Sequence, residues 1–246
     1  MRISFVIPAY NEEQLLPKCL ASVEKELART SCDAEVIVVN NASTDRTGEV
    51  ARSFSFVRVV DEPCKGLVRA RAAGLAAATG DLIANVDSDT MLPEGWLATV
   101  LREFARDEKL AALSGPYLYY DLSLPRRALV KLFYLGGYIA NAFLKLFGIG
   151  AMLQGGNFVF RRSFFEQVGG FNTSIEFYGE DTDVARRLSR VGKVKFTFAL
   201  PMFTTGRRLA HEGLITMGFK YAANFFYTNI VGTPLTEKYI DIRENL

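Results

Sequence analysis

Residues 81–89 read Asp81-Leu82-Ile83-Ala84-Asn85-Val86-Asp87-Ser88-Asp89, a short apolar run that ends in two carboxylates. Such a run is typical of a strand that is buried on both faces of a sheet. On an extended segment the side chains of Asp87 and Asp89 lean to the same side, so they can share one hard cation. The stretch therefore predicts a metal-binding edge at the end of a buried strand.

Strand-like and helix-like segments alternate three times before this stretch. Strands are expected at residues 3–7, 35–39 and 56–60, and helices at about residues 12–28, 44–53 and 67–78. Asn11 is expected to cap the first of these helices. This alternation predicts an α/β fold with a parallel, doubly wound sheet and right-handed crossovers.

Polar residues follow the four expected strands at the end where parallel sheets bind ligands. They are Pro8-Ala9-Tyr10, Asn40-Asn41, Asp61-Glu62 and Asp87-Ser88-Asp89. We expect them to line one crevice. Each turn by itself is equally typical of an ordinary cap or Asx turn. Four such turns at one edge, one of them with paired carboxylates, favour a nucleotide site.

The pattern is less regular after Asp89. We expect a helix at residues 93–106, strands at 111–115, 117–120 and 157–160, a helix at 180–191 and a strand at 193–199. The 246 residues contain no repeat and no low-complexity linker, which predicts one domain spanning residues 1–246.

The composition of the chain bears on the kinds of ligand it could bind and on the cellular compartment in which it is expected. The formal net charge of +2 gives no general argument for nucleic-acid binding. Three scattered cysteines, Cys19, Cys32 and Cys64, form no C-x-x-C motif and indicate a reducing compartment. Met1 leads directly into the first expected strand without a signal-peptide pattern, so a cytoplasmic location is expected.

A set of motifs in this order and spacing resembles the family 2 glycosyltransferases, which have the GT-A fold. The matching stretches are 6–13, 39–45, Gly66, Arg71, Ala72, Gly74, 80–81, 87–89, 155–157 and 179–183. Each motif alone is weak, but together they span about 180 residues and are specific. The part after Leu200 matches only loosely. The resemblance implies a nucleotide-sugar-binding half at residues 1–115 and an acceptor half at residues 116–246.

The resemblance also assigns the donor site. It implies that Pro8, Ala9, Tyr10 and Glu12 hold the base and ribose of a nucleotide-sugar donor, and that Arg71 approaches the diphosphate or the base. Asn40 stands where many members have an aspartate that reads the uracil edge. An amide both donates and accepts hydrogen bonds, so a UDP-sugar is favoured and a GDP-sugar stays open.

The metal and catalytic residues follow in the same way. The resemblance implies that Asp87, beside Ser88, binds ribose or metal, and that Asp89 coordinates Mg²⁺ or Mn²⁺. In the Glu180-Asp181 pair, Asp181 is implied as the general base of an inverting transfer. Independently of the family, a sugar diphosphate needs charge neutralisation on its leaving group and a carboxylate to accept the proton of the acceptor hydroxyl.

Two features late in the sequence can each be interpreted in two ways. His211, the only histidine, is either a further metal ligand or an imidazole without a ligand role. The pair Arg207-Arg208 is either a bidentate clamp on the diphosphate or a solvated basic turn.

Residues 126–152 form an amphipathic segment. Arg127, Lys131, Tyr134, Tyr138, Asn141 and Lys145 recur at helical spacing and form one stripe on a broad apolar helix. This pattern is typical of a helix that lies in a membrane interface. A second apolar stretch at 221–231 could join it. The alternative is a helix buried against the sheet or in a homodimer contact.

The favoured function is therefore a metal-dependent inverting glycosyltransferase. Its acceptor hydroxyl would belong to a sugar, a lipid-linked sugar or a cell-surface polysaccharide precursor, reached from the inner face of the cytoplasmic membrane. One alternative is a nucleotidyltransferase, although Pro8-Ala9-Tyr10-Asn11 is not the glycine-rich phosphate loop expected there. The other is a catalytically inactive nucleotide-sugar-binding or scaffold protein.

Overall fold

The computed structural model describes residues 1–149 and 151–236 of the chain. Its first half forms β1 (Ile3–Ala9), α1 (Leu16–Arg29), β2 (Ala34–Asn41), α2 (Thr47–Arg52), β3 (Val57–Glu62), α3 (Leu67–Ala77), β4 (Leu82–Val86), β5 (Thr90–Met91), α4 (Trp96–Arg106) and β6 (Leu110–Ser114). The predicted alternation of strands and helices is confirmed here.

The second half forms β7 (Tyr117–Tyr119), α5 (Leu124–Lys145), β8 (Asn157–Arg161), α6 (Arg162–Gln167), α7 (Glu180–Leu188), β9 (Lys193–Phe196), β10 (Met202–Thr204), α8 (Arg207–Glu212) and α9 (Leu214–Val231). The short elements β5, β10, α6 and α8 were not predicted. Gly150, inside the predicted amphipathic segment, and the last residues of the predicted acceptor half, 237–246, lie outside the described residues.

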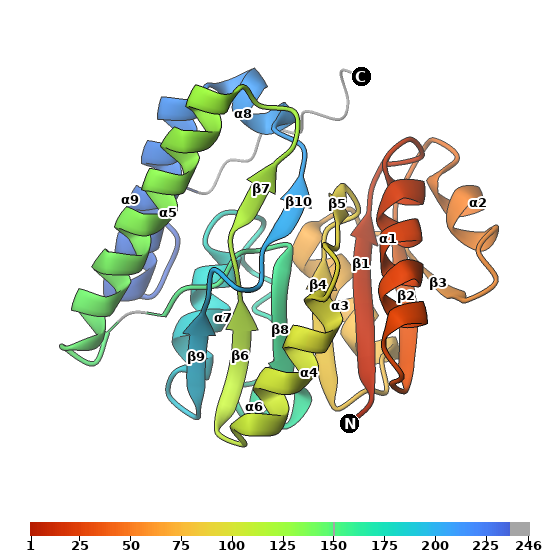
Figure 1. Cartoon of the computed structure of the whole chain (residues 1–246), viewed down its shortest axis with the longest axis horizontal. Helices are drawn as coiled ribbons and strands as arrows, with labels where there is room; N and C mark the ends of the chain where they lie inside the picture. The colour runs from red at the N-terminus through yellow and green to blue at the C-terminus, as the bar shows by residue number, and fades with distance from the viewer. Residues whose placement is uncertain (150, 237–246) are drawn as a thin grey trace.

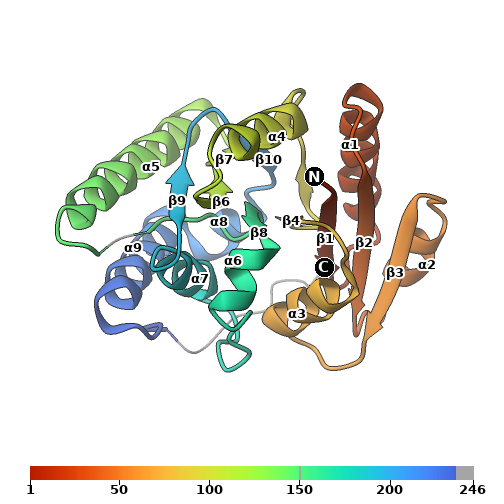
Figure 2. The ribbon, with the colours of Figure 1, turned by 90° about the horizontal axis from the view of Figure 1, so that it is seen from below.

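A seven-stranded sheet with the order β3-β2-β1-β4-β8-β6-β9 forms the centre of the molecule, and helices cover both of its faces (Figure 1, Figure 2). Neighbours from β3 to β4 are parallel, which confirms the predicted mostly parallel α/β sheet. The unpredicted feature is β8, which runs antiparallel between β4 and β6. Because β8 comes from the second half, the two halves share one sheet.

The strands are buried on both faces, so their side chains alternate between two apolar clusters. Ile3, Phe5 and Ile7 of β1 pack with residues of α1 and α4. Val6 packs on the other face with residues of α3 and α7. This double burial explains why the strands read as nearly continuous apolar runs in the sequence.

The start of α1 differs from the prediction that Asn11 caps it. Asn11 adopts a left-handed backbone conformation with φ 51°, and its side-chain oxygen accepts a hydrogen bond from the Thr44 N–H at 2.9 Å. The Asn11 side chain is thereby bound to the loop after β2 and does not cap α1. Helix α1 instead begins at Leu16, with Pro17 in its first turn.

A small second sheet, β5-β10-β7, connects the last part of the chain to the end of β4. Thr204 of β10 pairs with Thr90 of β5 on one side and with Tyr119 of β7 on the other. This pairing brings the start of α8 beside Asp89, which immediately precedes β5.

Helices α5 and α9 lie side by side at the left edge of Figure 1 and of Figure 2. A third apolar cluster, which includes Val130, Tyr134 and Met217, packs beneath them. The predicted stripe of α5 is divided: Tyr134 and Asn141 are buried against the protein, whereas Lys131, Tyr138 and Lys145 are exposed, as is the broad apolar face. No helix among residues 1–149 and 151–236 is long and apolar enough to cross a membrane.

Candidate active site

The carboxyl ends of β1 and β4 open into a cavity of about 550 Å³. Twelve of the residues predicted from the sequence line it: Pro8, Ala9, Tyr10, Asn41, Arg71, Asp87, Ser88, Asp89, Glu180, Asp181, Arg207 and Arg208. Small-molecule sites commonly span roughly 300–1,000 Å³. The predicted crevice at this edge of the sheet is confirmed, whereas the role of each residue stays a prediction.

The β2 end of the cavity differs from the sequence prediction. The Asn40 side chain does not line the cavity, because its Nδ2 donates a hydrogen bond to Asp61 Oδ1 at 2.9 Å. Asn41, which was also predicted to line the crevice, does line its wall, and its Oδ1 accepts a hydrogen bond from the Gly66 N–H at 2.8 Å. Successive side chains of a strand point to opposite faces. The prediction that Asn40 and Asp61-Glu62 line the crevice is therefore wrong.

Arg71 of α3 joins the two halves of the chain beneath the cavity. Only 1% of its surface is exposed. Its Nη2 donates to Asp87 Oδ1 at 3.0 Å and to the Gly155 carbonyl at 2.7 Å, and its Nη1 donates to the Glu180 carboxylate. A buried charge is tolerated when it is paired and hydrogen-bonded. Arg71 therefore fixes the carboxylates at the end of β4 and at the start of α7.

Asp87 is held on both sides. Its Oδ1 accepts from Arg71, and its Oδ2 accepts from the Tyr117 hydroxyl at 3.0 Å. Burial, with Asp87 nearby, raises the pKa of Tyr117 well above its ordinary value, so this hydroxyl stays protonated and can donate. A Cβ atom at position 156 would lie 2.1 Å from Asp87 Cγ, so only glycine leaves room for this arrangement. Asp87 is thus a carboxylate of fixed orientation.

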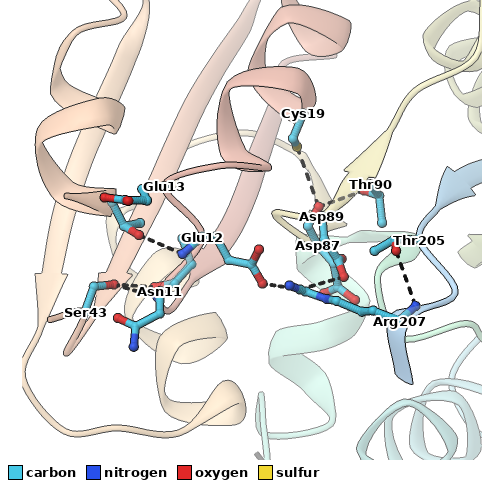
Figure 3. A network of polar contacts seen from close by, with 12 residues as sticks. Asn11, Glu12, Glu13, Cys19, Ser43, Asp87, Asp89, Thr90, Thr205 and Arg207 are labelled. Carbon is cyan, nitrogen blue, oxygen red and sulfur yellow. Dashed lines mark hydrogen bonds and ion pairs between the residues drawn. The ribbon is translucent and has the colours of Figure 1, made fainter. Parts of the chain in front are cut away.

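Arg207, at the start of α8, lies between two acidic residues of the first half (Figure 3). Its Nη2 contacts Asp89 Oδ2 at 2.9 Å and also donates to the Glu12 carboxylate. Glu12 is 2% exposed and does not itself line the cavity. The guanidinium therefore places a positive charge beside Asp89, where an anionic ligand would meet it.

Glu180 and Asp181 occupy the first turn of α7, opposite the end of β4. Burial raises the pKa of Glu180 to about 7 against the opposing effect of Arg71. Burial also raises the pKa of Asp181, although Asp181 Oδ1 accepts a hydrogen bond from the Thr182 N–H at 2.7 Å. A buried carboxylate with a raised pKa that lines a cavity is suited to accept a proton.

The fit of a divalent cation rests on Asp89. Among the residues that the structure describes, no three His, Cys, Asp or Glu side chains are grouped to hold a metal ion. Mg²⁺ sites, however, commonly use one or two carboxylates together with substrate phosphates. Asp89 lines the cavity and meets that requirement. His211 is exposed on α8 and does not line the cavity, so the structure does not bring it to Asp89.

Several cavity residues were not found from the sequence. Lys65 lies with its Nζ 4.1 Å from the centre of the Tyr10 ring. Gln154 accepts a hydrogen bond from the Tyr134 hydroxyl at 2.6 Å. Tyr117 and these residues sit in short or irregular segments, where no periodic pattern marks them. Only their position beside Gly155-Gly156 and Gly66 could have indicated them.

Comparison with known proteins places this site in a family. Residues 4–169 match the family described as glycosyl transferase family 2, and residues 143–212 match the family described as the N-terminal domain of galactosyltransferase. Because the first match covers more than half of the 246 residues, the chain belongs to glycosyl transferase family 2.

Individual relatives agree with this assignment. The chain is 29% identical over 202 residues to probable glycosyltransferase YdaM of Bacillus subtilis (strain 168), covering 78% of this chain and 47% of that protein. It is 31% identical over 197 residues to chondroitin synthase of Pasteurella multocida (strain Pm70), covering 78% of this chain and 19% of that protein. The chain thus spans less than half the length of these curated relatives.

A solved structure shares the fold. The mannosyltransferase PcManGT from Pyrobaculum calidifontis, solved in complex with GDP-Man and Mn²⁺, superimposes with a TM-score of 0.71 at 20% identity. The match covers 94% of this chain and 63% of that chain. The likeness shows the GT-A fold that the sequence motifs imply.

Proposed function

We propose that this protein is an inverting glycosyltransferase that moves a sugar from a nucleotide-diphosphate donor to an acceptor hydroxyl. One observation carries the proposal: Asp89 and Asp181, from opposite halves of the chain, line the same cavity. A transferase of this kind needs charge stabilisation on the donor side and a proton acceptor on the acceptor side.

Asp89 would hold Mg²⁺ or Mn²⁺, which when bound neutralises the charge that grows on the leaving diphosphate. Arg207 and Arg208 line the same cavity and would supply fixed positive charge toward that group. Pro8, Ala9 and Tyr10 line the wall on which the base and ribose would rest. The donor site would therefore be built on the first half and closed by α8.

Asp181 would accept the proton of the acceptor hydroxyl as that hydroxyl attacks the anomeric carbon. Its burial raises its pKa, which strengthens it as a base. A single displacement of this kind inverts the anomeric configuration. Glu180, paired with Arg71, would position the start of α7 without taking part in the proton transfer.

The donor is proposed to be a UDP-sugar, with a GDP-sugar as the other candidate. Because Asn40 points away from the cavity, Asn41 and Tyr10 are the side chains that would contact the base. The acceptor is proposed to be a lipid-linked sugar or a polysaccharide precursor, reached by a protein that works as a peripheral membrane protein at the inner face of the cytoplasmic membrane.

The Asp181→Asn variant tests catalysis. The amide cannot take the proton, so we expect turnover to fall by about 10²- to 10⁴-fold while donor binding is retained. Asp33→Asn, which changes an exposed carboxylate outside the cavity, is the matched control and keeps its activity. A donor-binding protein without catalysis would show no turnover in either background.

Donor binding is measured separately by calorimetry with UDP- and GDP-sugars, in Mn²⁺ or in EDTA. Metal-dependent binding of one nucleotide sugar supports the proposal and identifies the base. Metal-independent binding with normal turnover would contradict the role of Asp89, and transfer of a nucleotidyl group to the acceptor would favour a nucleotidyltransferase.

A further inference from the structure

Helices α5 and α9 bury several polar side chains and expose many large apolar ones. Tyr134 and Asn141 of α5 are buried, and Asn224, Thr228 and Asn229 of α9 have at most 3% of their surface exposed. A surface helix of a protein in water shows the opposite pattern, with an apolar stripe inward and a polar face outward. The inverted pattern indicates that these helices face surroundings other than water.

The buried amides of α9 are held by specific hydrogen bonds. Asn224 Oδ1 accepts hydrogen bonds from the backbone N–H groups of Leu235 and Thr236, each at 3.0 Å. Asn229 Oδ1 accepts from the Ala151 N–H at 3.2 Å. These bonds fix the rotation of α9 about its own axis. The exposure of its apolar face therefore follows from how the helix is built into the fold.

The outer side of both helices carries large apolar side chains. Besides Leu124 at the start of α5, six of them are at least 60% exposed: Leu132, Ile139 and Phe143 of α5, and Ile215, Phe219 and Ile230 of α9. We name the surface marked by these six residues the α5–α9 face. Contiguous exposed apolar surfaces of this kind mark interaction sites with proteins or membranes.

The charges on the two helices select one occupant for this face. Neither helix contains an aspartate or a glutamate, although the chain has 27 of them. Arg126, Lys131 and Lys145 of α5 are exposed. A second copy of the chain would bring these positive charges against its own, whereas a bilayer with anionic lipids would complement them.

The shape of the face fits a helix pair that lies flat on a bilayer. At 1.5 Å per residue, α5 and α9 extend over about 33 and 27 Å. Figures 1 and 2 show them side by side along one edge of the molecule. Tyr221 of α9 also lines the cavity, so the cavity borders one of the two helices of this face.

We propose that the α5–α9 face docks on an anionic lipid bilayer and so holds the cavity next to the membrane surface. The proposal that this face docks on a bilayer is argued from the two helices alone and does not depend on the proposed function. Its consequence for the reaction, that the acceptor is presented from the bilayer, rests on the proposed transferase function. Both helices would insert their apolar faces at the level of the headgroups and nearby acyl chains.

Flotation of the full chain with vesicles tests the docking. One vesicle is phosphatidylcholine alone, and the other is phosphatidylcholine mixed with phosphatidylglycerol. We expect the wild type to float with the mixed vesicles and to do so less as salt is raised. The doubly substituted variants Leu132→Ser/Ile139→Ser and Phe219→Ser/Ile230→Ser should each lose binding by about tenfold or more, because the inserted apolar area is reduced.

A charge pair supplies the matched control. Lys131→Glu on α5 should weaken binding to mixed vesicles by roughly fivefold or more, since each basic residue near an anionic surface contributes a factor of about five. Lys25→Glu, on the exposed side of α1, makes the same change away from the face and should bind like the wild type. Equal loss in both variants would overturn the proposal.

Two further experimental outcomes would each overturn the docking proposal. Failure of the wild type to float with either vesicle overturns the docking. A dimer by light scattering that the face variants convert to a monomer, without vesicle binding, identifies a second copy as the occupant and overturns it as well. Calorimetric donor binding on the same preparations separates the two proposals, because vesicle binding needs no nucleotide and donor binding needs no lipid.

Discussion

The cavity and the α5–α9 face both rest on buried polar groups, but of different kinds. Beneath the cavity the buried groups are charged, with Arg71 between Asp87 and Glu180. Beneath the α5–α9 face they are neutral amides such as Asn224 and Asn229. The first arrangement fixes charge where a ligand can meet it. The second fixes the orientation of helices whose outer surface is apolar. Polar burial would thus serve the proposed reaction in one region and the proposed contact surface in the other.

Substitutions in the charged arrangement beneath the cavity are expected to lower the stability of the protein more than substitutions beneath the α5–α9 face. Arg71→Met would leave Asp87 and Glu180 without their shared cation, so we expect the free energy of unfolding to fall by about 3–5 kcal/mol. Arg69→Met, on the exposed side of the same helix, is the control and should change it by less than about 0.5 kcal/mol. Urea denaturation measures both, and equal stability of the two variants would contradict the role of Arg71. Arg71→Met/Glu180→Gln should recover part of the loss.

Gly156 tests whether the cavity tolerates extra volume. A Cβ there would lie 2.1 Å from Asp87 Cγ and 2.2 Å from the Tyr117 hydroxyl. Gly156→Ala should therefore displace Asp87, cost about 1–3 kcal/mol of stability and weaken donor binding. Gly136→Ala on α5 meets no atom within 4 Å and should be neutral or stabilising. Unchanged donor affinity in Gly156→Ala would show that the orientation of Asp87 does not matter.

The two regions should also differ in their dependence on pH, because catalysis in the cavity needs an ionised carboxylate and vesicle binding by the α5–α9 face does not. Burial raises the pKa of Asp181, so this carboxylate gains a proton at a higher pH than an ordinary aspartate does. Because the base must be deprotonated, kcat/KM should fall as the pH drops through that raised pKa, by about tenfold per unit below it. Vesicle binding should stay constant, since α5 and α9 carry no carboxylate. A kcat/KM that is flat down to pH 4 would exclude Asp181 as the base.

The smallest effect is expected on α9, where removing a large apolar side chain should change stability less than removing a polar one. Phe219→Ser removes a large apolar group that is 76% exposed, so stability should change by less than about 0.5 kcal/mol. Asn224→Ala leaves the N–H groups of Leu235 and Thr236 without their acceptor and should cost about 1–3 kcal/mol. Thermal unfolding of both variants measures the difference. A larger loss in Phe219→Ser would show that the apolar face is covered within the protein itself.

The sequence predicted most of the parallel sheet, because doubly buried strands such as 82–86 show as apolar runs between helical segments. It did not predict the direction of β8, since an apolar run reads alike in either direction. It placed Asn40 in the cavity because the turn after β2 was taken as a unit, whereas a step of one residue reverses the side chain. It assigned Asn11 to a helix cap because the competing partner, Thr44, is distant in the sequence.

The orientation of α5 was left open by the sequence for a related reason. The stripe with Tyr134 and Asn141 was identified at the correct spacing, but its spacing fitted both a helix in a membrane interface and a helix buried against the protein. The structure turns Tyr134 toward Phe196 and the loop that carries Gln154 and buries Asn141, while Lys131 and Lys145 of the same stripe are exposed. Periodicity identifies the faces of a helix, and only packing decides which of them is inside.

Tyr134 belongs to both regions. Its ring is stacked on Phe196 beneath α5, and its hydroxyl accepts from the Tyr117 N–H at 3.2 Å and donates to Gln154 at the cavity wall. The cavity therefore sits at a fixed height above the outer surface of α5. If the α5–α9 face docks on a bilayer as proposed, this height would act as a ruler: acceptors whose headgroups are long enough would reach the cavity, and shorter ones would be excluded by distance.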